Sequence, residues 1–145
     1  MEILNRQASF NYFIYDKYEA GIVLTGTEIK SIRLGKCNIK DSYVMIKNNE
    51  VYLLNSHISR YEQGNIFNHE ETRDRKLLLN KNEILKLKDK TSIEGFTLIP
   101  LKIYFVKGKA KVLVGVCKGK KNFDKRESIK EKDLERELNK SNKYR

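Results

Sequence analysis

The sequence has few of the residues that build metal sites or disulfide frameworks. It contains no tryptophan, one proline, two histidines and two cysteines in 145 residues. Cys37 and Cys117 are far apart and lack a short metal-binding spacing, so we expect free thiols in a reducing cytosol. His57 and His69 have no cysteine or carboxylate partner at zinc-like spacing. Surface or hydrogen-bonding roles are therefore favoured over a role as metal ligand or base.

Membrane and targeting signals are also missing. No apolar run approaches the about 20 residues that a membrane-spanning helix requires. Residues 1–6 lack the apolar core of a signal peptide. We therefore expect a cytoplasmic protein that does not contact a membrane.

Catalytic motifs are equally scarce. Residues 118–121 are rich in lysine but lack the spaced first glycine and the final serine or threonine of a phosphate-binding P-loop. The chain has no G-x-S-x-G nucleophile motif and no carboxylate pair that suggests a hydrolase. The sequence therefore predicts no enzyme, no cofactor and no metal, which leaves a binding function.

Basic residues are what the sequence has in excess. Thirty lysines and arginines stand against nineteen aspartates and glutamates, which gives a net charge of +11. The excess divides between residues 1–117, at +6, and residues 118–145, at +5. Such a charge indicates a polyanionic partner, and without a lipid-anchoring helix it favours nucleic acid.

The clearest local pattern is a strand end that passes into a short basic helix at residues 19–36. Ile22 to Leu24 read as the end of a buried strand. Thr25 and Glu28 have the spacing of a capping box, and Gly35 can end the helix with a positive φ. We expect Ile29 and Ile32 to pack inward while Lys30 and Arg33 face the solvent.

The remaining pattern predicts a small antiparallel β-barrel. We expect a strand at Ser9–Tyr15 with a turn at Asp16–Lys17, a hairpin turning at Asn48–Asn49, and a long surface loop over residues 59–75. Asn80 and Glu83 predict a second capped helix, and two strands should follow at 96–106 and 109–118, the first distorted by Pro100. The fold class is mainly β with helices, an OB-type barrel of about six strands with two or three helices, its strand order left open.

A change of composition divides the chain into a barrel at 1–118 and a basic C-terminal tail at 119–145. The tail has too few large apolar residues to bury a helix face on its own domain. Its lysines and arginines nevertheless recur at helical spacing, at Lys132, Arg136 and Lys140. We predict a tail that is disordered when free and helical against an anionic surface.

Several residues are candidates for RNA contact, each with a structural alternative. The aromatic cluster at Phe10, Tyr12, Phe13 and Tyr15 suits core and sheet surface better than a stacking platform. Arg73, Arg75 and Lys76 divide evenly between solvated charge and phosphate contact. Glu28 is best explained as a capping group. Glu19 must be paired, exposed, or accept hydrogen bonds from base edges or 2′-hydroxyls.

Several separated motifs together resemble the SmpB family, the SsrA-binding proteins of bacterial trans-translation. They are Glu-Ala-Gly-Ile-x-Leu-x-Gly-Thr-Glu-Ile-Lys-Ser-x-Arg-x-Gly-Lys at 19–36, Asp-Ser-Tyr at 41–43, His-Ile-Ser at 57–59, Arg-x-Arg-Lys-Leu-Leu-Leu at 73–79 and Gly-Lys-Lys-x-x-Asp-Lys-Arg at 119–126. Two positions depart from the family pattern: Glu71 stands where proline is usual, and Phe123 where histidine or tyrosine is usual.

The resemblance implies an OB-type barrel that binds the tRNA-like domain of tmRNA and accompanies it to stalled ribosomes, without catalysis. It assigns tmRNA binding to Asn5, Glu19 and Lys111, with Lys30, Arg33 and Lys36 as neighbours on the same surface. It also suggests that Leu78 supports this surface from within the barrel. Alanyl-tRNA synthetase and elongation factor Tu become indirect partners through tmRNA.

For the tail the resemblance implies a place in the small ribosomal subunit. It puts one set near the decoding centre: Gly119, Lys120, Lys121, Phe123, Asp124, Lys125 and Arg126. It puts the following helix in the empty mRNA channel, with Lys130, Lys132, Arg136 and Lys140. A ribosomal or RNA-chaperone protein with an OB fold is the alternative that the basic composition also supports, and a small RNA-processing enzyme is a third.

Overall fold

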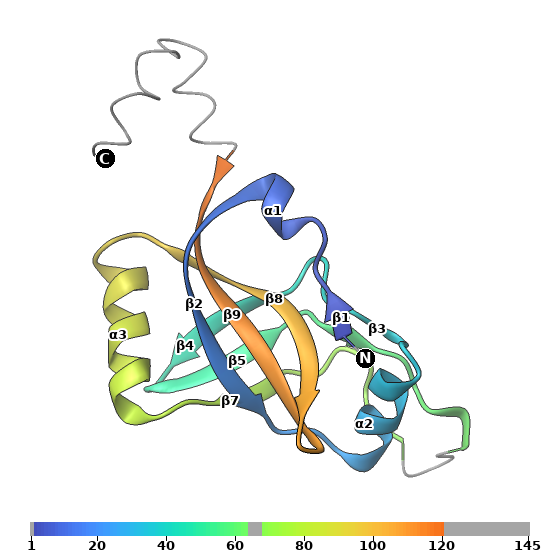
Figure 1. Cartoon of the computed structure of the whole chain (residues 1–145). Coiled ribbons are helices and arrows are strands. Elements are labelled where there is room, and N and C mark those ends of the chain that lie inside the picture. The colour runs from blue at the N-terminus through green and yellow to red at the C-terminus, as the bar shows by residue number, and fades with distance from the viewer. Residues whose placement is uncertain (1, 64–67, 121–145) are drawn as a thin grey trace.

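The computed structural model describes residues 2–63 and 68–120 (Figure 1). Its three helices are α1 (Ala8–Asn11), α2 (Gly26–Arg33) and α3 (Lys81–Ser92). Its strands are β1 (Glu2–Leu4), β2 (Tyr12–Ile22), β3 (Cys37–Asn38), β4 (Tyr43–Lys47), β5 (Glu50–Leu54), β6 (His57–Ile58), β7 (Arg75–Leu78), β8 (Thr97–Val106) and β9 (Lys109–Gly119). No helix in the described part of the chain is long and apolar enough to cross a membrane.

Six antiparallel strands form a closed ring, which confirms the predicted barrel and supplies its strand order. The order is β8-β4-β5-β7-β2-β9, and β9 pairs again with β8. The pairing between β4 and β8 is short, with Val44 opposite Leu98. Inward-facing aliphatic side chains fill the ring, among them the fully buried Val51, Leu53 and Ile103.

The start of the barrel differs from the sequence prediction. The predicted strand at Ser9–Tyr15 is wrong in its first half, because residues 8–11 form α1. The predicted turn at Asp16–Lys17 is also wrong. Strand β2 continues through these residues beside β9, and a β-bulge between Ile14 and Asp16 absorbs the irregularity. A bulge preserves the pairing on both sides, so polar turn-like residues can remain within a strand.

Both predicted capping boxes and the predicted hairpin turn at Asn48–Asn49 are confirmed. Helices α2 and α3 begin with capping boxes, at Thr25 with Glu28 and at Asn80 with Glu83. Gly35 has a φ of +79°, as the end of α2 requires. Asn48 and Asn49 both have positive φ, at 51° and 62°, which is the conformation of a two-residue hairpin turn. The β8–β9 register shifts after Pro100, as a proline in a strand predicts.

The aromatic cluster near the N-terminus divides between core and surface. Tyr12 packs beside Ala8, Ile99 and Cys117 in a small second cluster. Phe10, by contrast, is 73% exposed and Tyr15 is 56% exposed. Both cysteines are free thiols.

Candidate nucleic-acid interface

Four outward-facing residues on adjacent strands form the first candidate surface, which we call the wall patch: Glu19, Leu78, Tyr104 and Lys111. Side chains alternate in strands, so the buried neighbours Ala20, Leu77 and Ile103 place these residues outside the ring. The registers bring them together, since Gly21 pairs with both Leu78 and Lys111, and Lys111 pairs with Tyr104. Three segments that are distant in sequence therefore share one wall.

Tyr104 holds the Glu19 carboxylate in the wall patch. The Tyr104 hydroxyl donates to Glu19 Oε2 over 2.5 Å. Partial burial, followed by the hydrogen bond and the charge of Glu19, raises the pKa of Tyr104 to about 12. The phenol therefore stays protonated at neutral pH and keeps donating. Glu19 is exposed, and Tyr104 is its single hydrogen-bond partner in the described part of the chain.

Leu78 departs from the prediction that it supports this surface from within. It is 52% exposed, whereas its neighbour Leu77 is buried in the core. Gly21, which lies opposite Leu78, has no side chain to cover it. The wall patch therefore combines a carboxylate, an ammonium group and an exposed apolar side chain.

Helix α2 carries the predicted basic residues Lys30 and Arg33, and Lys36 follows it. All three are exposed, and the inward face of the helix packs through the fully buried Ile32. The Arg33 guanidinium lies 4.2 Å from the ring centroid of Phe105, the residue after Tyr104 on β8. This contact places Arg33 beside β8. Side chains alternate along a strand, so Phe105 and Tyr104 point to opposite faces, and the role of Arg33 in RNA binding stays a prediction.

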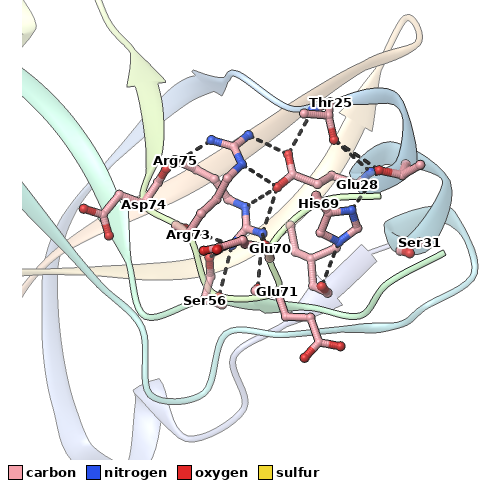
Figure 2. Close-up of polar contacts among 12 residues, drawn as sticks. Thr25, Glu28, Ser31, Ser56, His69, Glu70, Glu71, Arg73, Asp74 and Arg75 are labelled. Atoms are coloured by element: carbon pink, nitrogen blue, oxygen red, sulfur yellow. Dashed lines mark hydrogen bonds and ion pairs between the residues drawn. The ribbon is translucent and has the colours of Figure 1, made fainter. Parts of the chain in front are cut away.

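The second candidate set forms a buried ionic cluster around Glu28 (Figure 2). Arg73 donates through Nε and Nη2 to the two carboxylate oxygens of Glu28, over 2.8 and 2.7 Å. Arg75 Nε donates to Glu28 Oε2 over 2.9 Å. Burial favours the neutral acid, but the Arg73 hydrogen bonds, the Thr25 N–H and Arg75 outweigh it and lower the pKa of Glu28. Glu28 is fully buried, and the prediction of a capping role is confirmed.

The side chain of Arg75 is completely buried, so the structure contradicts its assignment as a phosphate contact. Its remaining N–H groups donate to Ser56 and to the carbonyl oxygens of Arg73, Glu70 and Glu71. Arg75 therefore anchors the long loop to the barrel. Glu71, the residue that departs from the family pattern, accepts the N–H of Ile58 as well, so backbone bonds hold this part of the loop without a proline.

The other arginine and lysine of this set remain partly accessible. The Arg73 side chain is 32% exposed while both its charged contacts go to Glu28. Lys76 faces outward on β7 and pairs with Glu50 across 3.1 Å. Lys76 is thus available to a phosphate only in competition with a surface carboxylate.

Asn5 also lies elsewhere than expected for a direct RNA contact. It is 8% exposed, and its Nδ2 donates to the Pro100 carbonyl oxygen over 2.9 Å. Its backbone N–H donates to the Leu101 oxygen, so Asn5 fixes the chain beside the β8 bulge. Asn5 is therefore nearly buried, and its assignment to tmRNA binding stays a prediction.

The tail is described only at its root. Gly119 ends β9, and Lys120 Nζ donates to the Ser9 carbonyl oxygen over 2.8 Å. The other predicted tail residues lie outside the described residues: Lys121, Phe123, Asp124, Lys125, Arg126, Lys130, Lys132, Arg136 and Lys140.

Sequence reasoning missed Tyr104. The signal was the alternation of β8, in which Lys102 and Tyr104 flank the buried Ile103. Its relation to Glu19 depends on a strand register that joins residues 85 positions apart.

Comparison with known proteins agrees with this architecture. The family model described as SmpB protein matches residues 2–144. An SsrA-binding protein of Shouchella clausii is 57% identical over 141 residues, covering 97% of this chain and 90% of the relative. An SsrA-binding protein of Desulfitobacterium hafniense is 59% identical over 134 residues, covering 92% and 86%.

A solved structure gives the same result in three dimensions. It is described as "tmRNA-SmpB: a journey to the center of the bacterial ribosome". The matching chain is 46% identical with a TM-score of 0.69, over 81% of this chain and 83% of that one. The match to the family model over almost the whole length, together with these relatives, shows that the chain belongs to the SmpB family.

Proposed function

We propose that this protein is an RNA-binding adaptor of trans-translation, which binds the tRNA-like domain of tmRNA and delivers it to stalled ribosomes. The relatives named SsrA-binding protein and the tmRNA-SmpB structure support the partner. The observation that carries the proposal is the wall patch, in which Tyr104 holds the exposed Glu19 carboxylate beside Lys111 and Leu78.

Each side chain of the wall patch suits a different part of folded RNA. A carboxylate accepts hydrogen bonds from 2′-hydroxyls and from base amino groups. Phosphate groups have no such donors, so they cannot bind it in this way. Lys111 supplies positive charge for the phosphate backbone, and we assign the same role to Lys30, Arg33 and Lys36. Leu78 provides an apolar contact for a sugar or an unstacked base. The combination of these three side chains therefore favours a folded RNA of matching shape over RNA in general.

Binding without catalysis is part of the proposal. The described residues contain no group of three or more metal-ligating side chains of the His, Cys, Asp and Glu types. Burial raises the pKa of Cys37 to about 12, because the cost of desolvation exceeds the effect of Arg75. Burial raises the pKa of Cys117 to about 11. Neither thiol is a ready nucleophile at neutral pH.

The second half of the function belongs to the tail. We extend the proposal to residues 119–145 as the part that occupies the decoding centre and the empty mRNA channel in a small ribosomal subunit. The support is the match of the family model through residue 144 and the basic composition of the tail. The two halves predict separable defects.

Charge reversal at Lys111 tests the binding half. Lys111→Glu should weaken binding to the tRNA-like domain of tmRNA and lower the salt dependence of the affinity by about 0.7–0.9 per lost phosphate contact. Lys47→Glu, at an exposed lysine on β4, two strands from β9 around the ring, is the control of equal charge change. Equal loss in both variants would assign the effect to net charge alone.

Removal of residues 121–145 tests the tail half. The shortened chain should bind the tRNA-like domain normally and fail to support tagging on stalled ribosomes in a reconstituted translation system. Loss of RNA affinity in the shortened chain would refute the division of labour. If cellular pull-down of the full chain enriches ribosomal RNA without selecting tmRNA, the ribosomal or RNA-chaperone alternative holds instead.

A further inference from the structure

A second basic and aromatic surface lies where the tail leaves the barrel, and the wall patch does not include it. We call it the tail-root patch and define it by Phe13, Tyr15, Phe96, Lys90, Lys118 and Lys120. The pairing of β2 with β9 builds it, with Phe13 opposite Lys118 and Tyr12 opposite Gly119. In Figure 1 the end of β9 lies beside the start of β2, and α2 lies at the other end of the barrel.

Phe96 is the centre of the tail-root patch. Lys118 Nζ lies 4.7 Å from its ring centroid and Lys90 Nζ lies 5.7 Å from it. The Tyr15 ring meets the Phe96 ring at 5.3 Å with an interplanar angle of 61°. Lys120 Nζ lies 5.0 Å from the Phe13 centroid. Three ammonium groups from α3, β9 and the tail root thus gather over two aromatic rings.

The three lysines of this surface form no ion pair with a described residue. In residues 2–63 and 68–120, none of these three lysines lies within 4.0 Å of a carboxylate oxygen. A similar lysine–aromatic contact on β4 and β5 differs in this respect. There Lys47 lies over Tyr52, whose hydroxyl donates to Glu50 at 2.6 Å. Of these two lysine–aromatic sites, the tail-root patch is therefore the one that attracts an anion.

We propose that the tail-root patch binds a short unpaired RNA segment, separate from the RNA surface bound by the wall patch. Because the two rings are inclined at 61°, one base stacks on the exposed Tyr15 ring and a neighbouring base on the partly exposed Phe96 ring. The displaced ammonium groups of Lys90 and Lys118 move onto the flanking phosphates. Aromatic rings stack with any base, so the site selects unpaired bases without selecting a sequence. The lysine ammonium groups contact the phosphates and set the path of the RNA backbone. This inference rests on the proposed role as an RNA-binding adaptor and adds a second RNA contact to it.

Binding of the full chain to a labelled, non-self-complementary RNA decamer tests the proposal, with the same decamer annealed as a duplex for comparison. Phe96→Leu retains the apolar packing of this partly buried residue and removes the ring, and Tyr15→Ser removes the exposed ring. Each should weaken decamer binding about tenfold and leave duplex binding unchanged. Lys118→Gln should lower the salt dependence of decamer binding by about 0.7, because one single-strand phosphate contact is lost.

Two controls separate this proposal from its alternatives and from the proposed function. Lys47→Gln removes a lysine that also lies over an aromatic ring, and it should leave decamer binding unchanged. All tail-root variants should bind the tRNA-like domain of tmRNA with wild-type affinity. Glu19→Ala should weaken binding to the tRNA-like domain and leave decamer binding unchanged. Decamer affinity that is unchanged in Phe96→Leu and Tyr15→Ser would overturn the proposal. So would equal weakening of decamer and polyglutamate binding by Lys118→Gln alone, since that result indicates a site for any polyanion.

Discussion

Glu19 and Glu28 lie nine residues apart and perform opposite tasks. Glu28 is fully buried and receives charge-assisted hydrogen bonds from two arginines and a backbone N–H, so its binding capacity is used within the fold. Glu19 is exposed and, among the described residues, receives one hydrogen bond, from Tyr104. In a protein with a net charge of +11, a carboxylate that is exposed and forms no ion pair with a described residue is available for a ligand.

Substitution of Glu28 should give the largest effect. Glu28→Gln leaves the buried Arg75 without its counter-charge, and breaking a buried ion pair from one side typically costs about 3–5 kcal/mol of unfolding free energy. Urea denaturation measures it, with Glu19→Gln as the control, for which we expect a change within about 0.5 kcal/mol. Equal stability of the two variants would remove the distinction between the carboxylates.

Acid should remove the stabilisation that the Glu28 carboxylate provides. The pKa of Glu28 in the folded protein lies below its ordinary value of 4.5, so the unfolded chain binds this proton more readily. The stabilisation from Glu28 is therefore complete above about pH 5 and is lost as the pH falls through the folded pKa. The stability difference between wild type and Glu28→Gln should shrink over that range. A difference that stays constant down to pH 3 would contradict this assignment.

Tyr104→Phe should give the smallest effect. It removes the hydrogen bond that orients Glu19 and keeps the ring, so we expect about a two- to tenfold loss of affinity for the tRNA-like domain and little change in stability. Tyrosinate absorbance on alkaline titration offers an independent measure, because Glu19→Gln should lower the pKa of Tyr104 from about 12. The pKa should remain above its ordinary value of 10, since burial is its first cause.

The features that sequence alone predicted are those set by neighbouring residues. The capping boxes, the Asn48–Asn49 turn and the distortion at Pro100 each depend on a few adjacent side chains and their backbone preferences. The barrel itself followed from counting short strands. Closure and strand order did not, because they depend on pairing between distant segments.

The misplaced site residues had a different cause. Arg75 and Lys76 look equivalent in a basic run, yet strand alternation sends Arg75 inward with Leu77 and leaves Lys76 and Leu78 outside. The buried arginine could have been suspected from this period of two. Its partner Glu28 could not, since that contact spans 47 residues.

The affinity of Glu19→Ala for the tRNA-like domain of tmRNA tests the central claim most directly, provided that its urea denaturation midpoint is measured on the same sample. A hydrogen bond to a charged group contributes about 1.5–3 kcal/mol, so we predict an affinity loss of about 10- to 100-fold with an unchanged midpoint. Wild-type affinity in a folded Glu19→Ala protein would contradict the assignment of this surface to RNA.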